Sequence, residues 1–166
     1  AMKGLDIKCH IAVGAVPGKK DAWQRDLKNS TPTQENISVG RKTYDELREL
    51  YARCKFIVVP LYPTDTDNGT TTILEAMAMG KAVICSRVDG QRDVIQEGKT
   101  GLFVAPQDPR ALREAIQYLW NNPKVAEDMG SAGRKHIEQF HTLDNWVNDV
   151  KIIVEDAISN QVKQNK

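Results

Sequence analysis

Residues 56–85 read FIVVPLYPTDTDNGTTTILEAMAMGKAVIC, and this stretch decides the fold. The apolar runs at 56–59 and 82–85 are continuous, as is typical of strands covered on both faces. Between them, a polar loop leads into a helix that we expect over residues 71–79, ending at Gly80. A strand, a helix and a second strand at this spacing predict a parallel sheet.

The same alternation runs along the whole chain, and it predicts a single α/β domain. We expect a Rossmann-like, doubly wound parallel sheet with helices on both faces. In such sheets ligands bind beyond the carboxyl ends of the strands. The site should therefore follow residues 13, 39, 59 or 85. The remaining predicted strands are 7–13, 37–39 and 102–104, and the remaining helices are 22–29, 44–53, 109–120, 123–139 and 143–159.

The final predicted helix carries an apolar stripe at helical spacing. We expect most of this stripe to pack on the sheet and part of it to be left exposed. The stripe consists of Leu143, Trp146, Val147, Val150, Ile153 and Val154.

Composition excludes several functional classes. The 166 residues carry a formal net charge of +1, which argues against nucleic acid as a partner. The three cysteines are far apart and have no metal-ligand spacing, and the three histidines are equally scattered. An odd number of buried thiols favours a reducing compartment, so we expect a cytoplasmic protein. No apolar run approaches the roughly 18 residues of a membrane span.

Residues 14–20, GAVPGKK, resemble a phosphate-binding P-loop only superficially. Three residues separate the two glycines instead of four, and Lys20 stands where a serine or threonine should hold magnesium. The Gly-x-Gly-x-x-Gly pattern of dinucleotide-binding proteins is also absent, so a dehydrogenase is not expected.

The loop before the predicted helix at 71–79 is the best candidate for a phosphate site. Backbone N–H groups at a helix start point outward with partial positive charge, and Gly69 allows close approach. Glu75 is the one charged residue in this nearly apolar helix, where ribose hydroxyls would satisfy it. Alternatively, Thr72-x-x-Glu75 is a capping box that only bonds the backbone. The residues alone leave both interpretations open.

Residues 74–84, LEAMAMGKAVI, closely resemble the signature of the group 1, family 4 glycosyltransferases. These are retaining enzymes with the GT-B fold, and the chain resembles their C-terminal, donor-binding domain. The resemblance favours the ligand-binding interpretation of Glu75. Flanking segments agree in order, and they are 36–40, 44–53, 56–60, 90–95 and 98–106.

The resemblance implies a role for each matching residue. Glu75 would bind the ribose of a nucleoside diphosphate, and Asp67, a glutamate in the family, would bond the donor sugar. The backbone of residues 68–70 would approach the sugar and the diphosphate. The base would be recognised just after the strand at 37–39. The predicted donor-binding residues are Arg41, Lys42, Asp67, Asn68, Gly69, Thr70, Thr71, Thr72 and Glu75.

Two features depart from the family pattern. Residues 68–70 read Asn-Gly-Thr where the family often has Pro-Phe-Gly, and Asp67 is one methylene shorter than the family's glutamate. The family's upstream Gly-Arg…Lys element is absent, so we expect it before Ala1. Residues 1–166 would then form one nucleotide-sugar-binding domain, with the acceptor domain and the first strand and helix of this domain preceding it.

The resemblance also implies the reaction and its partners. A UDP- or GDP-sugar would donate its sugar to an acceptor hydroxyl, as in polysaccharide biosynthesis, without a metal or other cofactor. The saccharide or glycolipid acceptor would bind the missing domain, which could also contact a membrane. No residue of this chain is a convincing catalytic base, so the chain alone should be inactive.

Other functions share parts of this pattern. A GT-B epimerase or phosphorylase would have the same architecture, and a non-catalytic nucleotide-binding module could descend from a transferase. A receiver-type signalling domain is disfavoured because Pro60, not an aspartate, follows the strand at 56–59.

Overall fold

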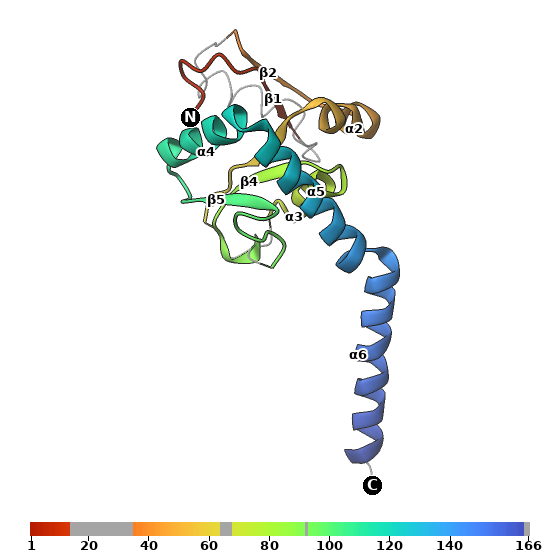
Figure 1. Cartoon of the computed structure of the whole chain (residues 1–166). Coiled ribbons are helices and arrows are strands. Elements are labelled where there is room, and N and C mark those ends of the chain that lie inside the picture. Colours follow the sequence, from red (N-terminus) through yellow and green to blue (C-terminus); the bar gives the residue numbers. More distant parts are fainter. Residues whose placement is uncertain (14–34, 64–67, 92, 165–166) are drawn as a thin grey trace.

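The computed structural model describes residues 1–13, 35–63, 68–91 and 93–164, with side chains through residue 160. The helix predicted at 22–29 lies outside these ranges. The other predicted elements are present, with ends that differ by a few residues (Figure 1). The strands are β1 (Cys9–Ala12), β2 (Ile37–Gly40), β3 (Phe56–Val59), β4 (Ala82–Ser86) and β5 (Gly101–Val104). The helices are α2 (Tyr44–Arg53), α3 (Thr70–Ala78), α4 (Pro109–Asn121), α5 (Pro123–Phe140) and α6 (Leu143–Gln164).

Every strand pairing in the described ranges is parallel, as the sequence predicts. β1 pairs with β2, and β4 lies between β3 and β5. The register aligns Phe56 with Ala82 and Val83 with Gly101. Parallel register places the carboxyl ends of β3, β4 and β5 at one edge of the sheet.

The central strand β4 is buried along its whole length because helices cover both of its faces. Its alternate residues Val83 and Cys85 belong to one core cluster, and Ala82 and Ile84 belong to another. The predicted α/β fold with helices on both faces is therefore confirmed. The first cluster includes Tyr51 of α2 and Ile73, Ala76 and Met77 of α3, and the second includes Ile116 and Leu119 of α4 and Ala126 and Met129 of α5.

Helices α3 and α5 approach each other closely through glycine. A Cβ atom on Gly130 of α5 would lie 2.1 Å from the carbonyl oxygen of Gly80, far inside van der Waals contact. Gly80 itself follows α3 with a φ of 67°. Next to it, the Lys81 ammonium donates to the carbonyl oxygens of Ala52 and Cys54 at the end of α2. The Gly80–Lys81 pair of the signature thus joins three helices.

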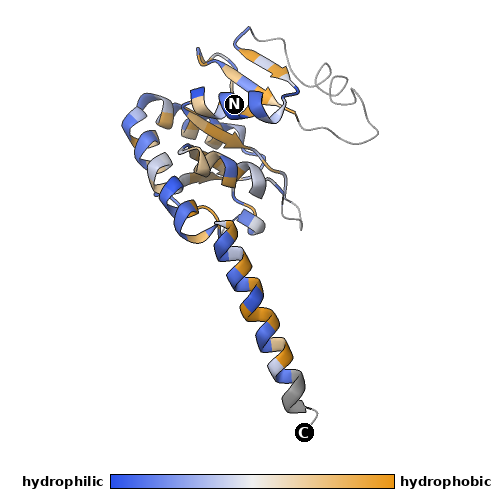
Figure 2. Ribbon diagram, turned by 90° about the vertical axis from the view of Figure 1, so that its right-hand side faces the viewer, coloured by the Kyte–Doolittle hydropathy of each residue, from blue (hydrophilic) through white to orange (hydrophobic). Residues whose placement is uncertain are grey.

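Helix α6 corrects one prediction, because its apolar stripe does not pack on the sheet. Figure 1 shows α6 extending away from the rest of the chain, and Figure 2 shows apolar residues along its exposed surface. Leu143 is 73% exposed and Trp146 is 63% exposed. Both faces of β4 are already covered by the preceding helices, and Thr142, with its backbone N–H and hydroxyl bonded to Asn145, begins a new helix after α5.

The glycine contact predicts that Gly130→Ala destabilises the fold. Alanine normally favours a helix over glycine, but here its Cβ meets backbone, so we expect a loss of about 1–3 kcal/mol in the free energy of unfolding. Urea denaturation measures this loss. Ser131→Ala, on the exposed side of the same helix, is the control and should change stability by less than about 0.5 kcal/mol. Equal stability of both variants would contradict the close approach.

Candidate functional site

The start of α3 is built without a side-chain cap. Gly69 is the N-cap residue, with a φ of 82°, and it has no side chain that could cap the first N–H groups. Because the helix begins at Thr70, Thr72 is already inside its first turn. The capping-box alternative for Thr72 and Glu75 is therefore wrong. The first turn contains no acidic residue, so its N–H dipoles face no competing carboxylate from their own helix.

Gly69 is required here by both conformation and space. Its φ lies in the left-handed region that favours glycine. A Cβ atom at this position would lie 3.0 Å from Val59 Cγ1 and 3.2 Å from Leu61 Cδ2. The helix start is thus pressed against the end of β3, which fixes where its N–H groups point.

Gln91 anchors the loop that precedes α3. This side chain is completely buried. Its Nε2 donates to the carbonyl oxygen of Asn68, and its Oε1 accepts a 3.1 Å hydrogen bond from the hydroxyl of Thr70. The Thr70 hydroxyl is thus engaged with the protein. Sequence reasoning included Gln91 only in the turn at 90–95 and did not identify this role.

Glu75 is held by a tyrosine of the neighbouring helix. The Tyr51 hydroxyl donates a 3.0 Å hydrogen bond to Glu75 Oε2. Burial, and then the adjacent Glu75 carboxylate, raise the pKa of Tyr51 well above its ordinary value, so the phenol stays protonated and keeps donating. Among the described residues, no partner is bonded to Glu75 Oε1. Tyr51 was missed, although a buried tyrosine usually needs a hydrogen-bond partner.

Two of the predicted donor residues, Arg41 and Lys42, are not joined to this cluster by any bond within the described ranges. Asp67 lies outside the described residues. Arg41 and Lys42 follow β2 and are exposed, and Lys42 Nζ lies 3.7 Å from Glu46 Oε1. Within the described ranges, no hydrogen bond or ion pair connects Arg41 or Lys42 with residues 68–75. The structure therefore brings together Asn68, Gly69, Thr70 and Glu75 with two residues that the sequence did not single out, Gln91 and Tyr51.

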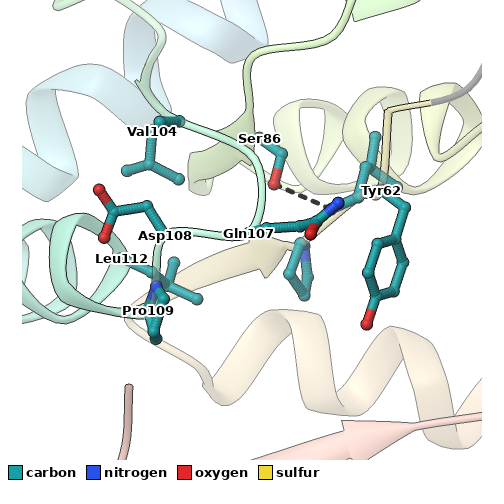
Figure 3. Close-up of a pocket in the computed structure, with 10 residues that line it drawn as sticks. Tyr62, Ser86, Val104, Gln107, Asp108, Pro109 and Leu112 are labelled. Carbon is teal, nitrogen blue, oxygen red and sulfur yellow. Dashed lines mark hydrogen bonds between the residues drawn. The ribbon is translucent and has the colours of Figure 1, made fainter.

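A pocket of about 430 Å³ lies at the carboxyl ends of β3, β4 and β5. Figure 3 shows its side chains gathered around these strand ends. Its position agrees with the rule for ligand sites in parallel sheets, but none of the predicted donor residues that the structure describes lines it. The lining residues are Pro60, Leu61, Tyr62, Ser86, Val104, Ala105, Gln107, Asp108, Pro109 and Leu112.

The described residues contain no group of three or more metal-ligating side chains placed to hold an ion. Burial raises the pKa of the Cys85 thiol to about 12, so it stays protonated and unreactive near neutral pH. In the same ranges, no helix has the length and apolar character needed to cross a membrane.

The fold and the uncapped helix start define an α/β domain suited to anionic ligands. The sequence family described as "Glycosyl transferases group 1" matches residues 3–136. The chain belongs to this family, as the resemblance at residues 74–84 predicts.

Individual relatives agree with this assignment. An uncharacterized glycosyltransferase of Methanocaldococcus jannaschii is 31% identical over 102 residues, which cover 61% of this chain and 28% of the relative. The O-antigen chain mannosyltransferase C of Escherichia coli is 25% identical over 129 residues, which cover 78% of this chain and 33% of the relative. The chain thus spans about a third or less of these relatives' length.

A solved structure shares the fold. Anabaena HepE in complex with UDP-glucose has a TM-score of 0.72 and 15% identity, with 90% of this chain and 41% of that chain covered. At this identity, the likeness shows the architecture alone. The predicted GT-B half-domain fold is confirmed.

The Tyr51–Glu75 hydrogen bond predicts that Tyr51→Phe lowers the free energy of unfolding by about 1–2 kcal/mol, because a partly buried carboxylate loses its donor. Chemical denaturation at neutral pH measures the loss. Tyr118→Phe, on α4, removes a hydroxyl from a side chain that is 48% exposed and should have almost no effect. If both variants unfold at the same denaturant concentration, the hydrogen bond contributes nothing.

Proposed function

We propose that this chain binds the nucleoside diphosphate part of a nucleotide sugar, and that the longer protein transfers the sugar to an acceptor hydroxyl with retention of configuration. Family membership supports transfer of a sugar. The resemblance of residues 74–84 to the retaining family supports retention. The UDP-glucose in the HepE structure supports a nucleotide sugar as donor.

The observation that carries this proposal is the start of α3. Gly69 leaves the helix without a side-chain cap, and Gln91 fixes the preceding loop. The N–H groups of Thr71 and Thr72 lie in the first helical turn, where the helix itself supplies no acceptor. Such groups stabilise a diphosphate and, during transfer, the charge that builds up on the leaving group. Asn68 and Asp67 would contact the donor sugar from the same loop.

Glu75 would bind the ribose hydroxyls. Tyr51 holds one carboxylate oxygen, so the side chain is oriented before a ligand arrives. The second oxygen, Oε1, would then accept from a vicinal diol. Orienting a polar group in advance reduces the entropy lost on binding. Arg41 and Lys42, exposed after β2, would contact the base, which could be uracil or guanine.

The expected affinity is low. A helix terminus contributes about 0.3–2 kcal/mol, and each charge-assisted hydrogen bond adds about 1.5–3 kcal/mol. Without the family's basic pair, we expect a Kd of about 0.1–1 mM, or roughly 4–5.5 kcal/mol. Calorimetry with UDP, GDP and ADP measures the affinity and ranks the bases. Absence of binding by all three at millimolar concentration would contradict the proposal.

The role of Glu75 predicts the effect of Glu75→Gln. The amide oxygen can still accept from Tyr51, so stability should change little, whereas the loss of charge should weaken nucleotide binding about tenfold, near 1.4 kcal/mol. Titration calorimetry with the preferred diphosphate measures this change. Glu127→Gln, an exposed residue of α5, is the control and should bind like the unchanged chain. Unchanged affinity with a lowered melting temperature would assign Glu75 a purely structural role.

A further inference from the structure

Two histidines meet at the joint between α5 and α6. His136 lies near the end of α5, and His141 is the residue that follows this helix. Their Nε2 atoms lie 3.3 Å apart. On one continuous helix, residues five positions apart face directions about 140° apart, so their side chains would not meet. The pair forms because α5 ends at Phe140, and α6 extends from this joint away from the rest of the chain (Figure 1).

The two rings are spaced as two ligands of one tetrahedral ion would be. Zinc binds imidazole nitrogens at about 2.0–2.1 Å, so two nitrogens on a tetrahedral ion lie about 3.3–3.4 Å apart and their ring centroids about 5.2 Å apart. Two nitrogens 3.3 Å apart that point straight at each other would instead place the centroids at about 5.6 Å, because each ring adds its own radius. The observed centroid distance is 5.1 Å. Both distances therefore match a shared ion better than a head-on hydrogen bond.

Neighbouring side chains orient the His136 ring. The Gln96 carboxamide lies 3.4 Å from His136 Nδ1, and the Phe140 ring centroid lies 5.1 Å from that of His136. Metal-bound histidines usually donate their second ring N–H to an oxygen, which leaves the other nitrogen to bind the ion. Gln96 can present its amide oxygen to Nδ1, because rotation about one bond exchanges the two ends of the amide. The Gln96 backbone is itself fixed, since its N–H and its carbonyl oxygen are both bonded to Thr100.

The donor set selects a transition metal. Imidazole nitrogen suits zinc, copper and nickel, whereas calcium and magnesium take oxygen ligands. His136 is half-buried and His141 is exposed, so an ion can reach the pair from solvent and complete its coordination with water. Zinc is the ion whose preferred tetrahedral geometry matches the two measured distances.

We propose that His136 and His141 bind one zinc ion through their Nε2 atoms, and that the ion stiffens the joint between α5 and α6. Each imidazole supplies one lone pair. The ring that carries its proton on Nε2 moves this proton to Nδ1 through solvent, so both rings bind in the neutral form. The ion would link the end of α5 to the residue that leads into α6, and so hold the direction in which α6 leaves. This proposal does not depend on the nucleotide site at α3.

The test uses the unchanged chain at about pH 7.5, above the ordinary pKa of histidine, with zinc chloride and magnesium chloride as probes. Calorimetry should show one zinc ion per chain and no binding of magnesium. Zinc should shift the imidazole NMR signals of His136 and His141 but not those of His10, which is bonded to Ser38 in the β1–β2 pair. Absence of zinc binding at about 1 mM would overturn the proposal.

Variants of the ligands locate the ion. His141→Ala changes an exposed residue, so the fold should persist. Zinc affinity should fall by more than about tenfold, because even the loss of an outer partner of a metal ligand costs that much. His10→Ala is the control and should bind zinc like the unchanged chain. Unchanged affinity in His141→Ala would assign the ion to other groups, such as the half-buried thiols of Cys9 and Cys54, and would refute the site.

Gln96 allows a gain of affinity to be tested. In Gln96→Glu a carboxylate accepts from His136 Nδ1, which makes the ring a stronger ligand, so zinc should bind about three- to tenfold more tightly. Gln139→Glu adds the same charge at an exposed position of α5 and is the control for charge alone. An equal gain in both variants, or a gain in neither, would contradict the orientation of His136 on which the site depends.

The effect on the joint has its own measurement. The His141 N–H donates to the Ile137 carbonyl oxygen, and the Trp146 N–H donates to that of Thr142. These N–H groups exchange with solvent when the joint opens locally. Zinc should slow their hydrogen exchange in the unchanged chain and not in His141→Ala. Zinc binding by the pair without slower exchange would refute the stiffening of the joint.

Discussion

The contact of Gly69 with the end of β3 is the constraint on which the candidate site depends. Val59 is buried in the core, so the start of α3 cannot move away from the strand without opening that core. The left-handed φ then directs the chain from the loop into the helix in a single residue. An uncapped helix start pressed on a strand end presents its N–H groups at the edge of the sheet, where ligands of parallel sheets bind.

Two polar side chains from other elements keep this edge in place. Gln91, from the turn after β4, bonds both ends of the segment 68–70, so the loop cannot rotate independently of the sheet. Tyr51, from α2, holds the Glu75 carboxylate in place through one hydrogen bond to Oε2. Both side chains are buried, where an unsatisfied polar group is costly. The site is therefore supported by hydrogen bonds whose loss would destabilise the fold and would also weaken ligand binding.

Much of the fold could be predicted from sequence because β4 and α3 are consistent at every level. The continuous apolar run at 82–85 predicts a strand with helices packed on both faces, and Gly80 predicts the end of the preceding helix. The structure contains both features, so the local sequence pattern and the tertiary packing agree. The candidate site was predictable where it depends on backbone, at Gly69 and the helix start. Gln91 and Tyr51 were missed because their partners lie 23 and 24 residues away, a separation that no local spacing encodes. The packing of the α6 stripe on the sheet was predicted wrongly because helical periodicity identifies an apolar face but does not identify the element that packs against it.

The start of α3 and the pocket at the carboxyl ends of β3, β4 and β5 lie at the same edge of the sheet but present different groups. The start of α3 offers N–H dipoles and no acidic side chain in its first turn, so it favours phosphate oxygens. Asp108, which lines the neighbouring pocket, already accepts from the Arg110 and Ala111 N–H groups at the start of α4. Helix α3 has a glycine as its N-cap where α4 has this aspartate. A carboxylate at the N-cap of α4 offsets the partial positive charge of that helix start, whereas Gly69 adds no charge at the start of α3. Of the two helix starts at this edge, the start of α3 is therefore the one that favours an anion.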